Sequence, residues 1–210
     1  MTAKQQTNKE RFCSLLRNTG RENIDYVIED LEGLGFFEAP ASSRNHYNFE
    51  GGLVEHSLNG YDAAMALRKS LIELKPTLEE KLPVESVTIA SLLHDVCKAD
   101  IYRKVTRGRK NEIGMYERTE EYALDYSNFP VGHGEKSVIM LLRSGLDLED
   151  CEILAIRWHM GPWEIDRSNR EQDGSYRQAG INTPLVPLIH AADSFAAALM
   201  EKEQTLKGDF

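Results

Sequence analysis

A histidine and an aspartate stand side by side in an otherwise apolar segment, Ser91–Cys97, which reads Ser-Leu-Leu-His-Asp-Val-Cys. Such a pair on the inward face of a helix is costly, because buried polar groups must find partners. The fold therefore has to bring further polar side chains to His94 and Asp95. An imidazole beside a carboxylate suits a transition metal better than magnesium or calcium, which prefer shells made of oxygen ligands.

Side chains of the same two types recur along the chain and can supply those partners. They are His56, His133, His159 and Asp193. If all six residues converge in space, they form a metal centre that can activate water for hydrolysis. Nothing else in the sequence points as directly to a chemistry.

Size and charge narrow the class of protein. A length of 210 residues with 41% hydrophobic and 28% charged residues is typical of a globular protein of about one domain. The formal net charge of −9 argues against a protein that coats nucleic acid, since neutralising phosphates needs lysine and arginine. A local basic pocket remains compatible with this charge.

Cysteine usage and apolar runs predict the compartment. Cys13, Cys97 and Cys151 are odd in number and form no C-x-x-C pair, so we expect a reducing cytoplasm rather than disulfides. Cys97 and Cys151 are expected to be small core residues. The first ten residues are too polar for a signal peptide. The apolar segment 184–200 is interrupted by His190 and is too short to span a bilayer, so we expect no membrane partner.

The hydrophobic pattern predicts a mostly α-helical fold. Helical spacing predicts helices over 5–18, 22–34, 53–74, 85–97, 134–144 and 147–160, and a last helix from about Pro184. Alternating residues between Ile101 and Tyr126 predict a small β-hairpin after the helix that carries the His-Asp pair. We interpret the polar segment 161–183 as a long loop. Residues 1–35 are predicted to form an N-terminal helical segment packed on a main domain of residues 36–210.

Two motifs in this order resemble a known family. The segment Gly51–Ser57 reads Gly-Gly-Leu-Val-Glu-His-Ser, and the His-Asp pair continues as Val-Cys-Lys98. Together with the later histidines and Asp193, they resemble the HD-domain metal-dependent phosphohydrolases. The first motif is especially similar to the HD domain of bacterial 3′–5′ exoribonucleases and of related phage and bacterial hydrolases. The resemblance covers roughly residues 40–200 and implies an HD-type helical bundle.

The resemblance implies a core set of metal ligands, His56, His94, Asp95 and Asp193, with positions left open for water and substrate. Lys98 matches the lysine that often follows the doublet in this family, and is expected near a phosphate oxygen. Asp95 and Lys98 are therefore the predicted catalytic residues. The expected cofactor is one or two divalent transition-metal ions, namely manganese, iron, nickel or cobalt.

Two further histidines leave the number of ions open. His133 and His159 fall where two-metal members of the family have extra histidines, and Asp95 would then bridge both ions. The alternative is that they bind substrate beside a single ion. Met160 replaces the second histidine of the cyclic-dinucleotide branch, which makes cyclic-di-GMP a less suitable substrate. His190 shares a helical face with Asp193 and is expected to hydrogen-bond to a ligand residue.

Charged and aromatic residues near these positions are candidates for binding substrate, although each is also compatible with an ordinary surface role. They are Arg103 and Lys104 in the basic run after the doublet, Glu135 and Lys136 after His133, and Trp163 and Arg167 in the polar segment.

The function predicted from the sequence is hydrolysis of a phosphoester of a nucleotide or nucleotide-like substrate by metal-activated water. Either phosphomonoesters or phosphodiesters fit. One alternative is a 3′–5′ exonuclease acting on single-stranded RNA or DNA ends, and another is a non-catalytic nucleotide-binding module. An oxygenase with a di-iron pair is a further class, and oxygen consumption would reveal it. The oligomeric state is left open.

Overall fold

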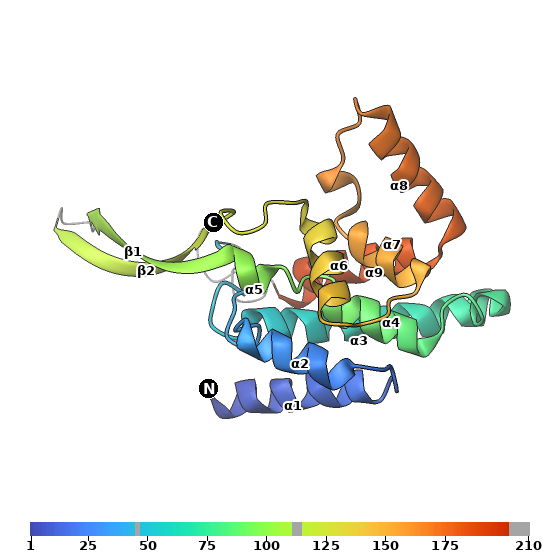
Figure 1. The fold of residues 1–210 in the computed structure, drawn as a ribbon, viewed down its shortest axis with the longest axis horizontal. Helices are drawn as coiled ribbons and strands as arrows, with labels where there is room; N and C mark the ends of the chain where they lie inside the picture. The colour runs from blue at the N-terminus through green and yellow to red at the C-terminus, as the bar shows by residue number, and fades with distance from the viewer. Residues whose placement is uncertain (45–46, 111–114, 202–210) are drawn as a thin grey trace.

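The computed structural model describes residues 1–44, 47–110 and 115–201 and is mainly helical (Figure 1). Its α-helices are α1 (Ala3–Arg17), α2 (Ile24–Gly33), α3 (Gly52–Leu74), α4 (Val84–Leu93), α5 (Lys98–Ile101), α6 (His133–Arg143), α7 (Asp150–Arg157), α8 (Arg170–Asn182) and α9 (Leu185–Phe195). Two strands, β1 (Tyr102–Lys110) and β2 (Tyr116–Leu124), form the hairpin. Short helical turns lie at Pro76–Leu78, Gly161–Glu164 and Ala196–Met200.

The core is built around α3 and α4. Residues 86–93 of α4 are all buried, as expected for a helix that is surrounded by others on every side. Helix α9 packs on α3, and α7 packs on both α4 and α9. Helices α1 and α2 cover the opposite side of α3 and α4 (Figure 1). The helices that carry the predicted ligands are thereby held in one packed body.

The N-terminal helices share the main hydrophobic core. Phe12 of α1 packs on Phe36 and Phe37, with ring centroids 5.1 and 5.6 Å away, and all three side chains are fully or almost fully buried. Arg21, between α1 and α2, donates to both carboxylate oxygens of the buried Glu152 in α7, at 3.0 and 2.7 Å. The predicted boundary between residues 35 and 36 remains a prediction.

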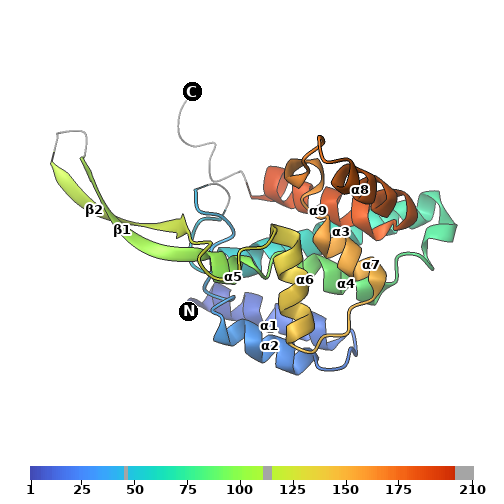
Figure 2. The ribbon, with the colours of Figure 1, turned by 45° about the horizontal axis from the view of Figure 1, so that its top comes forward.

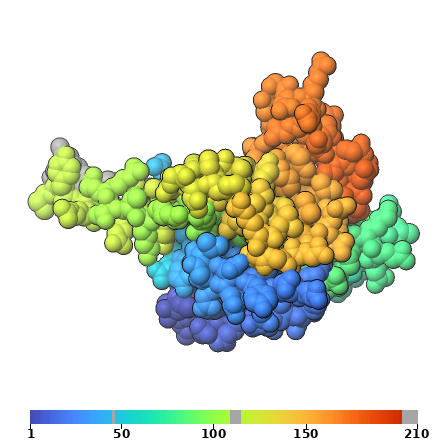
Figure 3. Space-filling model, in the orientation of Figure 1, coloured from blue at the N-terminus to red at the C-terminus, as the bar shows by residue number. Residues whose placement is uncertain are grey.

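The β-hairpin projects from the helical body, as Figures 2 and 3 show. Its strands pair antiparallel, with Tyr102 opposite Leu124 and Lys110 opposite Tyr116. The predicted fold class, a mostly α-helical bundle with a small hairpin after the His-Asp helix, is confirmed. Helix α4 is shorter than expected, because it ends at Leu93 and the His-Asp pair lies in the turn that leads to α5.

The prediction of a loop over 161–183 was wrong, because α8 occupies its second half. The side chain of Asn169 begins this helix by accepting from the N–H groups of Glu171 and Gln172. Ala179 is its one fully buried residue, so the segment carries no apolar stripe from which its period can be read.

Among the described residues, no single helix is both long and apolar enough to cross a membrane. Helix α8 together with Leu185–Met200 meets those two criteria jointly, across a bend of 98°.

Candidate metal centre

The fold brings the six predicted ligands together from separate elements. His56 lies near the start of α3, His94 and Asp95 follow α4, His133 begins α6, His159 follows α7, and Asp193 lies in α9. Ligand atoms of His56, His94 and Asp95 lie within 4.8 Å of one another, and so do those of His94, His159 and Asp193. These groups can hold a divalent metal ion.

The four residues of the predicted core set converge tightly. His56 Nε2 lies 3.2 Å from Asp193 Oδ1 and 3.3 Å from Asp95 Oδ2. His94 Nε2 lies 3.3 Å from His56 Nε2 and 3.4 Å from Asp95 Oδ2. Two imidazole nitrogens and two carboxylate oxygens therefore face one point, which is the mixed donor set that suits a transition metal.

The other two histidines approach the opposite oxygen of the same aspartate. His133 Nε2 lies 2.5 Å from Asp95 Oδ1, and His159 Nε2 lies 3.3 Å from it. The rings of His133 and His159 are neighbours, with centroids 5.3 Å apart. Asp95 thus separates two pairs of histidines, with one carboxylate oxygen turned toward each pair.

Backbone carbonyls fix the orientation of two imidazoles. His94 Nδ1 donates to Ser91 O at 2.8 Å, and His159 Nδ1 donates to Ile156 O at 2.7 Å. A carbonyl only accepts, so each Nδ1 carries the hydrogen and each Nε2 presents a lone pair to the cluster. Among the described residues, the buried His159 Nε2 has no hydrogen-bond partner, which is the environment that a bound cation would satisfy.

Glu201 holds the third imidazole and was not predicted from the sequence. Its Oε1 lies 2.9 Å from His56 Nδ1, and Asn59 Nδ2 lies 3.3 Å from the same oxygen. The Glu201 side chain is fully buried, although it follows the short helical turn after α9. Its only sequence signal is a glutamate in a charged segment, where an exposed position is the usual outcome.

Lys98 lies directly against the Asp95 carboxylate. Its Nζ is 2.5 Å from Asp95 Oδ2, and both side chains are buried. Burial acts to raise the pKa of Asp95, but Lys98 and the surrounding imidazoles outweigh it and hold that pKa well below its usual range. Burial likewise opposes ionisation of Asp193, whose pKa is nevertheless lowered by its contact with His56. Both aspartates are therefore anionic at neutral pH.

Cys97 contacts the cluster, whereas the sequence indicated only a small core residue. Its side chain is buried, and its Sγ lies 3.6 Å from His133 Nδ1. Asp95, Cys97 and His133 form a third group whose ligand atoms lie within 4.8 Å of one another. The signal was present in the sequence, because Cys97 is two residues beyond Asp95.

His190 contacts the backbone of a predicted ligand. Its Nδ1 donates to His159 O at 2.7 Å. Gly161, with φ of 58°, allows this approach, since a Cβ there would lie 2.5 Å from the His190 ring. His190 thus holds the segment that carries His159.

The predicted substrate-binding residues are mostly engaged in ion pairs within the protein. Arg103 pairs with Asp100 and Asp125 at 3.5 and 3.8 Å, and Lys104 pairs with Glu50 at 2.9 Å. Their roles in binding substrate remain predictions.

The other candidates for binding substrate come from α6 and from the segment after α7. Lys136 pairs with Asp100 at 2.5 Å, and Glu135 pairs with Arg157. Trp163 is 84% exposed, and Arg167 is also exposed. Contact of either side chain with a substrate stays a prediction.

Comparison with known proteins identifies the family. The HD domain family model matches residues 53–198, which is most of the chain, and the protein therefore belongs to the HD domain family. The chain resembles dihydroneopterin 2′,3′-cyclic phosphate phosphodiesterase of Methanocaldococcus jannaschii, with 29% identity over 103 residues, 47% of this chain and 36% of that protein. It also resembles the 3′–5′ exoribonuclease YhaM of Shouchella clausii, with 38% identity over 63 residues, 30% of this chain and 17% of that protein.

Both matches leave most of the relative's own length uncovered. No solved structure matches the chain significantly.

Proposed function

We propose that the protein is a metal-dependent phosphohydrolase that cleaves a phosphoester of a nucleotide or nucleotide-like substrate. The observation that carries this proposal is the position of Asp95. Its Oδ2 faces His56 and His94, while its Oδ1 faces His133 and His159. Asp95 and the imidazole pair on each side of it would hold divalent ions, since this mixed donor set suits transition metals.

In this proposal, His56, His94 and Asp193 complete one metal position, and His133 and His159 complete the other, with Asp95 shared. Bound divalent metal supplies a water of lowered pKa as the nucleophile and polarises the phosphoryl group.

Lys98 has a separate role in the proposed reaction. Its ammonium keeps Asp95 ionised and lies 2.5 Å from that carboxylate, where it can offset negative charge developing on phosphoryl oxygens. The His133 and Asp193 side chains are 19% and 17% exposed, whereas His56, His94 and His159 are at most 1% exposed. The substrate is therefore expected to reach the cluster past one of these two more exposed side chains.

The names of the two relatives favour a phosphodiester over a phosphomonoester, since one is a cyclic-phosphate phosphodiesterase and the other an exoribonuclease. We therefore propose a nucleotide phosphodiester as the first substrate to test. The second candidate, a 3′–5′ exonuclease acting on single-stranded ends, is favoured by the 38% identity to the exoribonuclease. A hydrolase is expected to turn over its nucleotide, which separates it from a module that only binds one.

The test combines metal content with hydrolysis. We expect purified protein to bind manganese, iron, nickel or cobalt and to hydrolyse bis(p-nitrophenyl) phosphate, and we expect Asp95→Ala to lose both properties together. Asp147→Ala, at an exposed carboxylate before α7, is the matched control and should retain both. Digesting 2′,3′-cyclic nucleotides, mononucleotides and labelled oligonucleotides in parallel separates the substrate classes. Metal-loaded protein that hydrolyses none of these compounds would refute the proposal.

A further inference from the structure

A cavity of about 250 Å³ opens beside the candidate metal centre, on the side of His133 and Cys97. Its remaining wall is mostly apolar and aromatic, and is made by Ile101, Tyr126, Phe129 and Val131. Three of these four come from the segment that joins the hairpin to α6. The cavity thus adjoins the cluster at His133, which is the most exposed of the predicted ligands. A substrate could reach the cluster there.

Among the described residues that line this cavity, none offers an unpaired cation for a second phosphate. Lys136 is the only ammonium among the residues that line it, and its Nζ is held by Asp100 at 2.5 Å and by Asn128 O at 2.7 Å. Glu164 also lines the cavity. Its Oε1 accepts from the backbone N–H of His133 at 3.0 Å, and its Oε2 lies 3.6 Å from Arg157 Nη1 but has no hydrogen-bond partner among the described residues. This cavity therefore favours an uncharged group, and its carboxylate favours one that bears N–H donors.

Phe129 is held in an unusual conformation at the wall of the cavity. Its φ is 48°, in the left-handed region that a bulky residue rarely adopts. The guanidinium of Arg143 lies 4.6 Å from the centroid of its ring. A strained backbone that persists in a packed structure is often part of a functional site.

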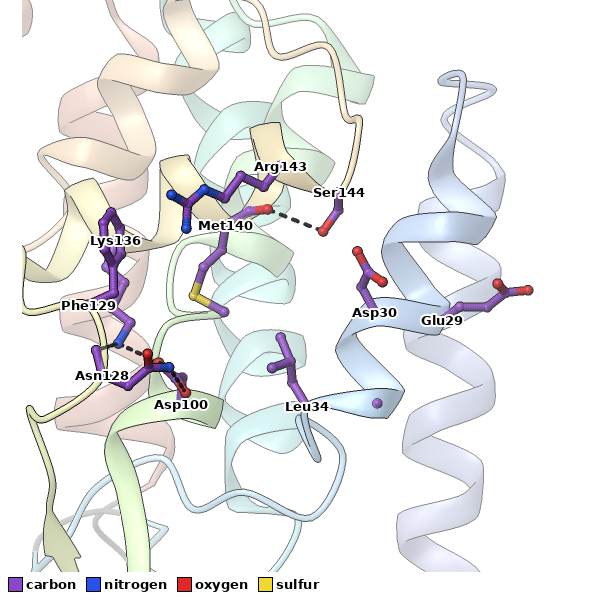
Figure 4. A pocket seen from close by; sticks show the side chains of 11 residues that line it. Glu29, Asp30, Leu34, Asp100, Asn128, Phe129, Lys136, Met140, Arg143 and Ser144 are labelled. Atoms are coloured by element: carbon purple, nitrogen blue, oxygen red, sulfur yellow. Dashed lines mark hydrogen bonds and ion pairs between the residues drawn. The ribbon is translucent and has the colours of Figure 1, made fainter.

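The other side of Phe129 faces a separate groove. Figure 4 shows this groove of about 450 Å³ between α2 and α6, where Arg143, Phe129 and Lys136 form one wall and Leu34 faces them. Neither Cys97 nor His133 lines the groove. Phe129 and Lys136 therefore form a partition, and only the smaller cavity adjoins the candidate metal centre.

We propose that this smaller cavity binds the nucleobase of the substrate, a flat heterocyclic ring with N–H donors, while the phosphate lies at the metal cluster. Tyr126 and Phe129 provide aromatic surface on which a base can stack, and stacking of this kind accepts any base. Tyr126, Phe129 and Val131 would then determine the preference for a ligand with a base over a sugar phosphate without one. This inference rests on the proposed function, because it assigns the part of the same substrate that is not hydrolysed.

Equilibrium binding to metal-free protein tests the inference without relying on turnover. GMP and AMP are compared with ribose 5-phosphate, which carries the same sugar and phosphate without the base. We expect the nucleotides to bind at least about fivefold more tightly, which is the lower range for one base stacked on an aromatic side chain. Val131→Trp fills the cavity and should abolish this difference. Tyr126→Ala should reduce it, and Tyr26→Ala, at a tyrosine that is 66% exposed on α2, should leave it unchanged.

The possible outcomes separate this inference from the proposed function. Equal binding of nucleotides and ribose 5-phosphate, or an unchanged preference in Val131→Trp protein that remains folded by circular dichroism, would overturn the nucleobase site. Metal-dependent hydrolysis of bis(p-nitrophenyl) phosphate can persist in either case, and the proposed function would then stand without it. A base preference in a protein that hydrolyses no phosphoester would instead support the nucleobase site and refute the proposed hydrolase activity.

Discussion

Glu201 fixes the hydrogen position on His56 by accepting from the ring nitrogen that faces away from the cluster. A carboxylate in this position also makes the opposite nitrogen a stronger donor to a metal. We predict that Glu201→Ala weakens metal affinity by about 10- to 100-fold, the usual cost of losing such a partner. Glu201→Gln keeps an acceptor without the charge, so its affinity should lie between those of the alanine variant and the native protein.

Competition with a chelating dye measures these affinities. Glu80→Ala, at an exposed glutamate after α3, is the control and should bind metal like the native protein. Native affinity in a folded Glu201→Ala protein would show that the buried carboxylate has no influence on the metal.

The individual residues of the site were predictable to different degrees. His56, His94, Asp95 and Asp193 could be named because motif and order indicate them, and the structure places them together. Glu201 could not be named, since only tertiary packing distinguishes it from the exposed glutamates of this acidic chain. Residue type indicates which side chains can bind a metal. The residues that hydrogen-bond to those ligands depend instead on which distant segments pack beside them in the fold.

His133 begins α6 and His159 follows α7, and the close approach of these two helices depends on a glycine. A Cβ on Gly134 would lie 2.2 Å from the carbonyl oxygen of Arg157, far inside any permitted contact. We predict that Gly134→Ala pushes the two helices apart and destabilises the protein by about 1–3 kcal/mol, as overpacking does. The separation should also weaken metal binding at the His133–His159 pair.

Urea unfolding and metal titration measure the two effects. Gly174→Ala in α8 is the control, because a Cβ there meets nothing within 4 Å. Alanine is also the better helix former, so this variant should be as stable as the native protein or slightly more stable. If Gly134→Ala matched it in stability and metal binding, the close approach of α6 and α7 would be unimportant.

Secondary structure elements were predictable where one face is buried. Helix α3 was expected over 53–74 and spans Gly52–Leu74, and the hairpin was expected between Ile101 and Tyr126 and lies there. Helix α8 was missed because most of its residues are exposed and few are apolar, so hydrophobic periodicity does not indicate it. The end of α4 was placed too late, since the turn after Leu93 is as buried as the helix before it.

At the scale of the whole molecule, a buried ion pair links the N-terminal part to α7. Arg21 is 12% exposed and Glu152 is fully buried, with Nη2 and Oε1 2.7 Å apart. Removing one partner leaves a buried charge without compensation, so Arg21→Ala should destabilise the protein by about 3–5 kcal/mol. Arg17→Ala removes an exposed pair with Asp25 and should cost less than about 1 kcal/mol.

Urea unfolding measures the stability of both variants. Because each replaces an arginine by alanine, a difference in stability reflects the burial of the ion pair that is lost. Equal stability of the two would show that residues 1–35 do not depend on this link to the rest of the protein. The predicted packing of an N-terminal segment on the main domain would then rest on its apolar contacts, such as that of Phe12 with Phe36.

The candidate ligands are distributed from α3 to α9, with Glu201 beyond α9, and this distribution has a consequence for synthesis. A growing chain presents His56 first and Asp193 much later, so the complete donor set does not exist until α9 has left the ribosome and packed on α3. The adjacent His94 and Asp95 are available earlier, but they are only a fraction of the set. The full complement of metal would therefore bind only after α9 has been synthesised and packed, so it would not serve as a template for folding the first helices.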